Sequence, residues 1–250
     1  MSIDVAVIDY GMGNLRSVSK AIEHVAPGRK VLVTGNPDEV AAAERVVFPG
    51  QGAMPDCMRE MESRGLHAAL VAAARDKPFL GICIGLQMLF DSSEEGDVAG
   101  LAVLPGRVRR FPHDLMVAPD GSRLKVPHMG WNEVFYAPSL GKASELSSAG
   151  AKSFLGHPKG TSCGARPGER LDRTEPHPVW EGIADGSRFY FVHSYYVEAG
   201  EPSLVAAFSV YGFPFTCAVA KDNIFAVQFH PEKSAQSGLA LLGNFMRWKP

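Results

Sequence analysis

The chain has 250 residues, and its 46% hydrophobic content is that of a globular protein with a substantial core. Its 25 basic and 27 acidic residues nearly cancel, so the net charge of −2 gives no reason to expect a nucleic acid or an anionic membrane as a partner. We expect a cytoplasmic chain without cofactor or metal, because the sequence has no apolar run of transmembrane length, no signal-peptide pattern, and no zinc-ligand or disulfide spacing among its four cysteines.

The first 90 residues alternate between short apolar segments and segments with helical spacing. Strands are expected at residues 3–8, 30–33, 46–48 and 79–82. Helices are expected over residues 15–25, over 55–74 with a break near Gly65, and from the end of the last of these strands to about Phe90. Strands that alternate with helices predict a parallel sheet with helices on both faces.

The second half changes character and predicts an antiparallel extension of the same sheet. Strand-like segments separated by turns lie at residues 101–111, 188–192, 204–210, 215–220 and 224–229. A last helix is expected over residues 238–248. Between these parts, residues 138–178 are rich in Gly, Ser, Ala and Pro and show little apolar periodicity, which is typical of a loop.

Cys83 lies between Gly81 and Gly85, where an apolar strand should turn into a helix. This spacing is that of a nucleophile elbow, with cysteine in place of serine. The glycines allow close backbone approach, and the free N–H groups and partial positive charge of the helix start favour the thiolate, which is the attacking form. By itself the pattern fits a buried structural cysteine about as well as a nucleophile.

A second motif, His230-Pro231-Glu232, follows a strand-like stretch near the end of the chain. On an extended backbone, side chains two residues apart leave the same face. A carboxylate at this spacing can fix the tautomer of His230 and stabilise its imidazolium form. Alone, the pair also fits a surface salt link; together with the cysteine elbow it predicts a catalytic triad of Cys83, His230 and Glu232.

A third motif, Gly50-Gln51-Gly52, follows the strand at 46–48. An acyl transfer needs two N–H donors where the oxyanion forms. We expect one donor to be the backbone N–H of Ile84, directly after the nucleophile, and the other to come from the Gly50–Gly52 loop. An ordinary strand-to-helix turn also fits this loop.

Together these segments resemble the class I (triad) glutamine amidotransferases. Motifs at residues 8–15, 126–132 and 191–196 resemble the glutaminase subunits of imidazole glycerol phosphate synthase, an enzyme of histidine biosynthesis. The resemblance implies an α/β fold, a three-layer α/β/α open sheet that is flavodoxin-like and largely parallel with an antiparallel extension. It also implies a single glutamine amidotransferase domain over residues 1–250, with 138–178 as a surface insertion, because the family usually spans this stretch in far fewer residues.

The resemblance implies that the chain hydrolyses glutamine to glutamate and ammonia through a γ-glutamyl thioester on Cys83. The positions that match the family's glutamine site are Gly50, Gln51, Gly52, Ile84, Gln87, Ser194 and Tyr195. Gln51 departs from the family, which often carries valine there, but a backbone donor should survive that change. We interpret His128 and His193 as packed, structural histidines.

The resemblance also implies a partner, a cyclase subunit of (β/α)₈-barrel fold in a heterodimer. The cyclase would receive the ammonia and make imidazole glycerol phosphate and an aminoimidazole carboxamide ribotide. Candidate contact residues in the matching motifs are Asn14, Met129, Trp131 and Lys233. Exposed aromatic and methionine side chains fit an interface, although they fit a core equally well.

Alternative functions differ in the acceptor or in the chemistry. The same glutaminase could serve an anthranilate, aminodeoxychorismate, pyridoxal phosphate, GMP or CTP synthase, but the Gly-Met-Gly-Asn and Pro-His-Met-Gly-Trp-Asn segments speak against these. A stand-alone cysteine hydrolase or peptidase would have no reason to carry Gln87 and the Pro-Glu-Lys-Ser segment. A non-catalytic binding module would not need all the members of a triad.

Overall fold

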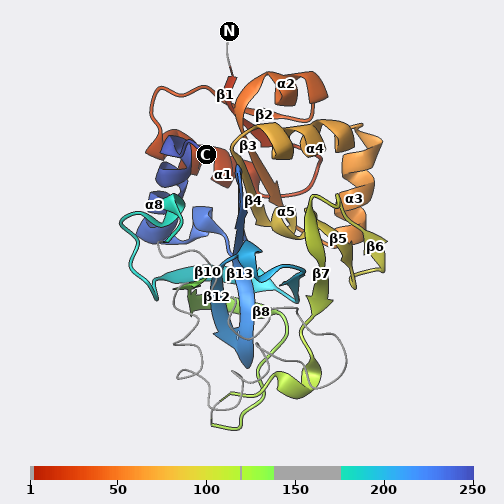
Figure 1. Ribbon diagram of the computed structural model, residues 1–250, viewed down its shortest axis with the longest axis vertical. Helices are drawn as coiled ribbons and strands as arrows, with labels where there is room; N and C mark the ends of the chain where they lie inside the picture. Colours follow the sequence, from red (N-terminus) through yellow and green to blue (C-terminus); the bar gives the residue numbers. More distant parts are fainter. Residues whose placement is uncertain (1–2, 119, 138–175) are drawn as a thin grey trace.

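Strands and helices alternate over the first 90 residues (Figure 1). The strands of this region belong to the parallel part of a sheet that has 12 strands among the described residues. The computed structural model describes residues 3–118, 120–137 and 176–250. Neighbouring strands run parallel in the order β2-β1-β3-β4-β14. Their bounds are β1 Ile3–Ile8, β2 Val31–Thr34, β3 Ala43–Gly50, β4 Phe79–Cys83 and β14 Ile224–Val227. The predicted parallel sheet is therefore confirmed for β1 to β4. Strand β14 was predicted in the antiparallel extension, but it runs parallel to β4 and antiparallel to β13, so it joins the two parts of the sheet.

Helices cover both faces of this parallel part, as predicted. Helices α1 and α8 pack against each other on one side, and α2 and α4 on the other (Figure 1). The predicted break near Gly65 is confirmed, since Gly65 has a φ of 67° between α3 and α4. The helix bounds are α1 Leu15–Val25, α2 Pro37–Ala42, α3 Met54–Ser63, α4 His67–Asp76 and α8 Ala235–Arg247.

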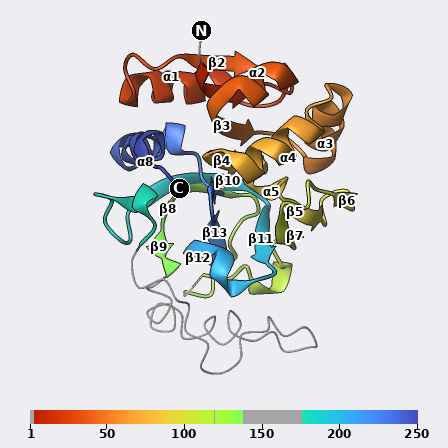
Figure 2. The ribbon, with the colours of Figure 1, turned by 45° about the horizontal axis from the view of Figure 1, so that its top comes forward.

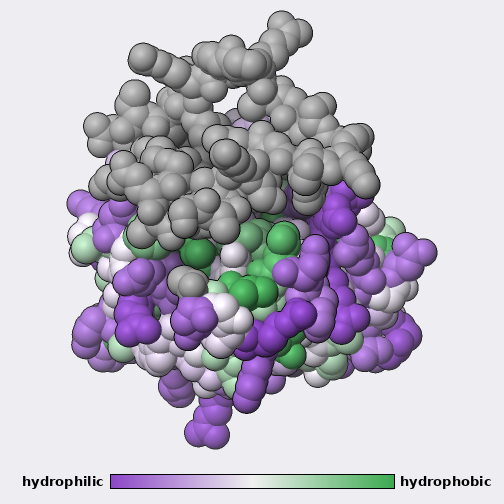
Figure 3. Space-filling model, turned by 90° about the horizontal axis from the view of Figure 1, so that it is seen from below, coloured by the Kyte–Doolittle hydropathy of each residue, from purple (hydrophilic) through white to green (hydrophobic). Residues whose placement is uncertain are grey.

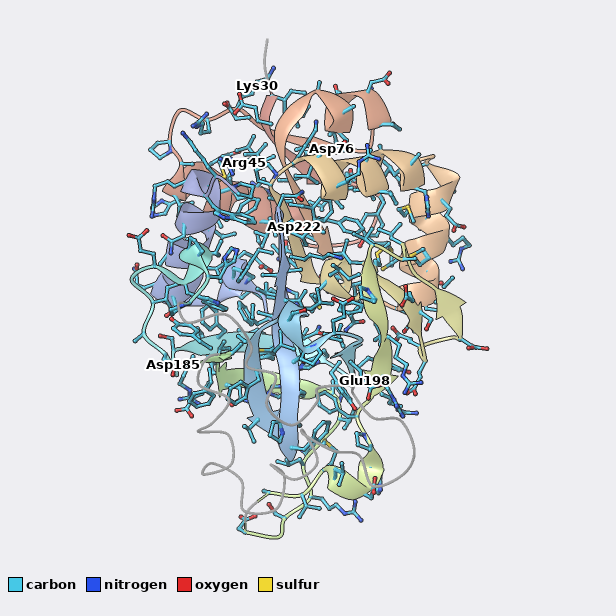
Figure 4. The ribbon with its side chains drawn as sticks, in the orientation of Figure 1. Lys30, Arg45, Asp76, Asp185, Glu198 and Asp222 are labelled. Atoms are coloured by element: carbon cyan, nitrogen blue, oxygen red, sulfur yellow. The ribbon has the colours of Figure 1, made fainter. Side chains whose placement is uncertain are left out.

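Arg45 ties the C-terminal helix to the sheet. Its Nη1 donates to the backbone oxygens of Phe245 and Trp248, at 3.2 and 2.6 Å, and the side chain lies between β3 and α8 (Figure 4). Its guanidinium carbon also lies 5.9 Å from the centre of the Phe245 ring. Because the last carbonyls of a helix have no intrahelical donor, Arg45 caps the end of α8.

Beyond β14 the sheet continues mostly with antiparallel pairs, which confirms the predicted antiparallel extension, although β5 pairs parallel with β7. Strand β13 pairs with β14, β11 and β12, and β11 pairs in turn with β7. The remaining bounds are β5 Phe90–Ser93, β6 Val98–Ala99, β7 Leu104–Arg110, β9 Phe135–Tyr136, β11 Tyr195–Ala199, β12 Val205–Tyr211 and β13 Phe213–Lys221. Short 3₁₀ turns lie at η1 His113–Leu115, η3 Pro178–Trp180, η4 Pro202–Leu204 and η5 Pro231–Lys233.

The strand predicted at residues 188–192 belongs to a different sheet. Strand β10 (Arg188–His193) pairs antiparallel with β8 (His128–Glu133) in a sheet of their own, and the chain enters the main sheet only at β11. In Figure 2 these strands and β9, β11, β12 and β13 curve around one another below the parallel part. The cross-strand partner of β10 lies far away in sequence, 59 residues earlier for the pair Tyr190 with Trp131, so the local pattern could not place it.

The helix predicted to run to about Phe90 is much shorter. Helix α5 covers only Ile84–Gln87, and the chain then enters β5. The backbone oxygens of Met88 and Leu89 accept hydrogen bonds from the N–H groups of Leu101 and Val103, at 2.7 and 2.9 Å. Residues 84–90 are all buried, so their apolar pattern fits a helix and a strand equally well, and pairing with residues distant in sequence decides between them.

The predicted insertion at 138–178 lies mostly outside the described residues. At its end, His177 packs against the core, with its ring centre 4.7 Å from those of Phe225 and Trp248.

The face of the molecule seen from below is mixed in character. Where side chains are coloured in Figure 3, apolar ones gather near the middle of this face among hydrophilic ones. Among the described residues, no helix is long and apolar enough to cross a bilayer.

Candidate active site

Cys83 occupies a strained turn between β4 and α5. Its φ of 56° and ψ of −112° lie where residues with a side chain are rarely found, which is typical of functional sites. A Cβ on Gly85 would overlap the backbone oxygen of Phe48, and one on Gly81 would come within 2.9 Å of the Ala226 Cβ. The close packing of β3, β4, α5 and β14 therefore explains why glycine is required on both sides of Cys83, as predicted.

His230 and Glu232 form a hydrogen-bonded pair just beyond β14. His230 Nδ1 lies 3.0 Å from Glu232 Oε1, and their side chains are 5% and 1% exposed. The Ser234 hydroxyl donates to the His230 oxygen at 2.6 Å and accepts from the Tyr190 N–H at 3.0 Å, which fixes the backbone of the pair. Because a carboxylate only accepts, Nδ1 carries the hydrogen and Nε2 is left for another group.

The charges around His230 favour its protonated form. Burial alone would lower the pKa of His230, but the nearby Cys83 sulfur and the Glu232 carboxylate outweigh burial and raise this pKa to about 10. His230 Nε2 has no hydrogen-bond partner in the parts of the chain that the structure describes. An imidazolium beside the sulfur is the arrangement in which a cysteine is held as thiolate.

Strand register brings these motifs to one edge of the sheet. Gly50 pairs with Cys83, and Val227 pairs with Ile82, so β3, β4 and β14 all end at the same level. The carboxyl ends of parallel strands are where open α/β sheets place their ligands. The elbow, the Gly50–Gly52 loop and His230 therefore meet although the sequence separates them widely.

A cavity of about 240 Å³ opens above Cys83. It is lined by the predicted residues Gln51, Gly52, Cys83, Ile84, Gln87, Ser194, Tyr195 and His230, and also by Glu95, Pro127, Val192 and His193. Gly50 lies beneath the lining, where a Cβ would overlap the Tyr10 hydroxyl. Glu232 stands behind His230, and its bond to that residue makes it a positioning group.

The predicted oxyanion loop, Gly50–Gly52, is held by a hydrogen bond from Cys57. The Gln51 oxygen accepts a hydrogen bond from the Cys57 thiol at 3.6 Å, and Gly52 has a φ of 113°. The C=O and N–H of a trans peptide point in opposite directions, so the N–H of Gly52 points away from Cys57. The N–H of Ile84 begins α5 and has no helical carbonyl to bind.

Two glutamine side chains connect the sulfur to the cavity wall. Gln228 Nε2 lies 3.8 Å from Cys83 Sγ, and Gln87 Nε2 donates to Gln228 Oε1 at 3.0 Å and to the Tyr195 oxygen at 3.3 Å. Gln87 is 1% exposed, and its Oε1 has no hydrogen-bond partner within the described ranges. Gln87 therefore offers a buried acceptor in the cavity.

Glu95 and Gln228 were not predicted as site residues. Glu95 Oε2 accepts the N–H of Met54 at 2.8 Å, which turns its carboxylate from the β5–β6 turn into the cavity. In sequence, Glu95 follows Ser93 and Glu94 and precedes Gly96, a pattern typical of a solvated turn. Gln228 lies two residues before His230, so proximity to the triad was the signal that could have identified it.

The predicted partner-contact residues are accessible to different degrees. Met129 and Trp131 are 62% and 46% exposed on one face of β8, and the Trp131 ring meets the Tyr190 ring edge-on at 6.1 Å. Lys233 is exposed in η5, directly after the triad, and Asn14 is half-buried before α1. The described residues hold no cluster of side chains suited to a metal ion.

Comparison with known proteins identifies the family. A family model described as glutamine amidotransferase class-I matches residues 6–248. The chain belongs to the class-I glutamine amidotransferases. It is 60% identical to the imidazole glycerol phosphate synthase subunit HisH of Aromatoleum aromaticum and 58% identical to that of Dechloromonas aromatica, with at least 97% of each chain covered. Members of this family are enzymes, and the α/β prediction is confirmed.

Solved structures show a similar fold at low sequence identity. PurLQS from Thermotoga maritima has a TM-score of 0.61 at 15% identity, with 99% of each chain covered. A glutamine amidotransferase from the same organism has a TM-score of 0.52 at 14% identity, with 95% of this chain and 79% of that chain covered. At these identities the likeness concerns the fold alone.

Proposed function

We propose that this chain is the glutaminase subunit of an imidazole glycerol phosphate synthase and hydrolyses glutamine with a triad of Cys83, His230 and Glu232. The observation that carries the proposal is that the strained Cys83 elbow and His230, which is hydrogen-bonded to Glu232, line the same cavity. The HisH name of the relatives and their identity of up to 60% support the histidine pathway over the other acceptors.

The site geometry supports a thioester mechanism. The Cys83 thiolate attacks the side-chain amide carbon of glutamine, and the oxyanion is held by the Ile84 N–H and an N–H of the Gly50–Gly52 loop. The protonated His230 then gives its Nε2 proton to the departing ammonia. Water, deprotonated by His230, attacks the γ-glutamyl thioester and releases glutamate. Glu232 holds the imidazole through Nδ1 and stabilises its charged form throughout.

Charge and hydrogen-bond capacity in the cavity match glutamine. The carboxylate of Glu95 is suited to the α-ammonium group, and the unpartnered Gln87 Oε1 is an acceptor for an N–H of the substrate. Ser194 and Tyr195 also line the cavity. These polar groups would orient the amide over Cys83.

Ammonia leaving this site needs a receiver, because it is protonated and unreactive in neutral water. We propose a cyclase subunit of (β/α)₈-barrel fold, docked over Met129 and Trp131 with Asn14 and Lys233 at the same surface. The exposed Trp131 and Met129 supply the aromatic and flexible apolar contacts that interfaces favour. The cyclase would join the ammonia to a phosphoribulosyl formimino precursor.

Glutamate release tests this proposal. The chain is assayed with glutamine alone, and then with an imidazole glycerol phosphate cyclase subunit and its nucleotide substrate, with Cys83→Ala as the matched control. We expect weak activity alone and strong activity in the complex, both abolished in Cys83→Ala. Full activity without a partner would contradict the pathway assignment, and equal activity in Cys83→Ala would contradict the triad.

A further inference from the structure

Two buried histidines that the proposed mechanism does not use lie beside the cavity. His128 on β8 and His193 on β10 are direct cross-strand partners and are 3% and 6% exposed. His128 Nδ1 lies 2.9 Å from His193 Nε2, and the His128 ring is stacked between the rings of Phe191 and Tyr211, at 4.9 and 4.0 Å. Such a pair needs one ring to donate and the other to accept.

A backbone carbonyl at one end and a side-chain amide at the other decide which ring donates. His193 Nδ1 lies 2.8 Å from the Tyr195 oxygen, which can only accept, so Nδ1 carries the hydrogen. Neutral His193 then has a bare Nε2, which accepts from His128 Nδ1. At the other end, Asn132 Nδ2 lies 3.3 Å from His128 Nε2 and 2.8 Å from the Val210 oxygen. Each ring therefore has one possible tautomer.

Both rings are uncharged at neutral pH, as this hydrogen-bond chain requires. Burial lowers the pKa of His128 to about 4. Burial and the neighbouring His128 lower the pKa of His193 to about 3. A proton added to His193 Nε2 would place two N–H groups against each other in the 2.9 Å contact with His128. A proton added to His128 Nε2 would face the N–H group of the Asn132 amide at 3.3 Å.

The chain of hydrogen bonds continues to the reacting sulfur. The Tyr195 oxygen also accepts from Gln87 Nε2, at 3.3 Å, so His193 and Gln87 share one carbonyl in the cavity wall. Gln87 Nε2 donates to Gln228, whose own Nε2 faces Cys83 Sγ. With its amide nitrogen held this way, the Gln87 side chain has one orientation in the cavity wall.

We propose that His193 is a positioning residue for glutamine binding, which holds the Tyr195 carbonyl and through it Gln87, and that His128 and Asn132 fix its tautomer. The inference rests on the proposed glutaminase function. Since His193 acts on groups that hold the substrate before the reaction, its loss weakens binding of glutamine more than it slows the chemical step.

Two substitutions of His193 separate this role from a packing role. An asparagine amide reaches the place of Nδ1, so His193→Asn keeps a donor for the Tyr195 oxygen. A glutamine amide reaches the place of Nε2, so His193→Gln keeps the contact with His128 and loses that donor. Both replace a buried ring by a smaller amide, so a packing role would make them behave alike.

Glutamate release, measured with the cyclase subunit present, gives KM and kcat for glutamine. We expect His193→Gln to raise KM about tenfold with kcat within about threefold, and His193→Asn to keep KM within about threefold. The same split is expected for His128→Gln against His128→Asn, since only asparagine preserves the donor to His193. Equal changes in KM within each pair, in an active protein, would overturn the proposal.

Nitrogen-15 spectra of the histidine-labelled wild-type chain give a readout that needs neither activity nor a folded variant. We expect a protonated Nδ1 and a bare Nε2 in both His128 and His193, and a protonated Nε2 in either would overturn the inference. If the wild-type chain releases no glutamate with or without a cyclase, the proposed function fails, while the spectra still decide whether the histidine chain has the stated direction.

Discussion

Cys83 and His230 follow neighbouring parallel strands, whereas His193, Ser194 and Tyr195 lie where the chain leaves the β8–β10 sheet for the main sheet. The parallel part thus supplies the proposed reacting groups, and the antiparallel part supplies the opposite wall of the cavity. In the parallel part, close backbone packing sets the geometry around Cys83. In the antiparallel part, a chain of side-chain hydrogen bonds sets the geometry of the opposite cavity wall.

The comparison implies that changes in the two parts affect different kinetic constants. Groups beside the sulfur act on the bonds that form and break, so their loss lowers kcat. Groups in the opposite wall hold the substrate, so their loss raises KM. The following substitutions break or sharpen that distinction.

The largest effect is expected from His230→Ala in the parallel part. Without the imidazole, nothing takes the thiol proton or protonates the departing ammonia, so kcat for glutamate release should fall by about a thousandfold or more. The measurement is steady-state glutamate release in the presence of the cyclase, with His67→Ala on the exposed surface of α4 as the control. A fall of less than tenfold would remove His230 from the triad.

Glu232→Gln should cost less, about a hundredfold in kcat, because Glu232 orients the imidazole and contacts no substrate. It should also lower the pKa of His230 from its value of about 10, because the carboxylate is one of the groups that raise it. A histidine with a raised pKa contributes to stability fully below its ordinary value of 6.5 and loses this contribution as the pH rises towards 10.

The titration of His230 by nuclear magnetic resonance measures this shift. In the variant, His230 should lose its proton at a lower pH than in the wild-type chain. The exposed Glu62→Gln serves as a charge-matched control. An unchanged His230 pKa would mean that Cys83 alone sustains the protonated imidazole.

Trp131→Ala tests whether the outer face of β8 is the proposed cyclase surface. Removal of a half-exposed aromatic anchor should weaken cyclase binding about tenfold and leave glutamate release by the isolated chain unchanged. Val33→Ala, a 39% exposed apolar residue at the far edge of the parallel part, is the control. Titration calorimetry with the cyclase gives the comparison, and equal affinities for the two variants would place the partner elsewhere.

The smallest effect is expected from deletion of residues 141–175 with a short linker in their place. If the predicted insertion takes no part in either half of the site, glutamate release and cyclase affinity should stay within about twofold of the full chain. Both are measured as for Trp131→Ala. A collapse of either quantity would show that the segment has a functional role.

Local sequence determined the parallel part of this protein in detail. Each of the three motifs spans only a few residues: the elbow around Cys83, the His230-Pro231-Glu232 run and the Gly50–Gly52 loop. Their glycines and proline allow the turn geometry that each motif requires. The strand before His230, however, was predicted in the antiparallel extension, and only its parallel pairing with β4 brings His230 to the same edge as the other two motifs.

The tertiary structure alone decided what depends on pairing between distant segments. The N–H groups of Leu101 and Val103 capture the carbonyls of Met88 and Leu89, which ends α5 early. The register of β8 with β10 places His128 against His193 across 65 residues of sequence and turns two apparently structural histidines into a directed hydrogen-bond chain. Strand pairing depends on backbone N–H and C=O groups that meet only in the folded chain. A local residue pattern does not record which distant strand will supply these groups.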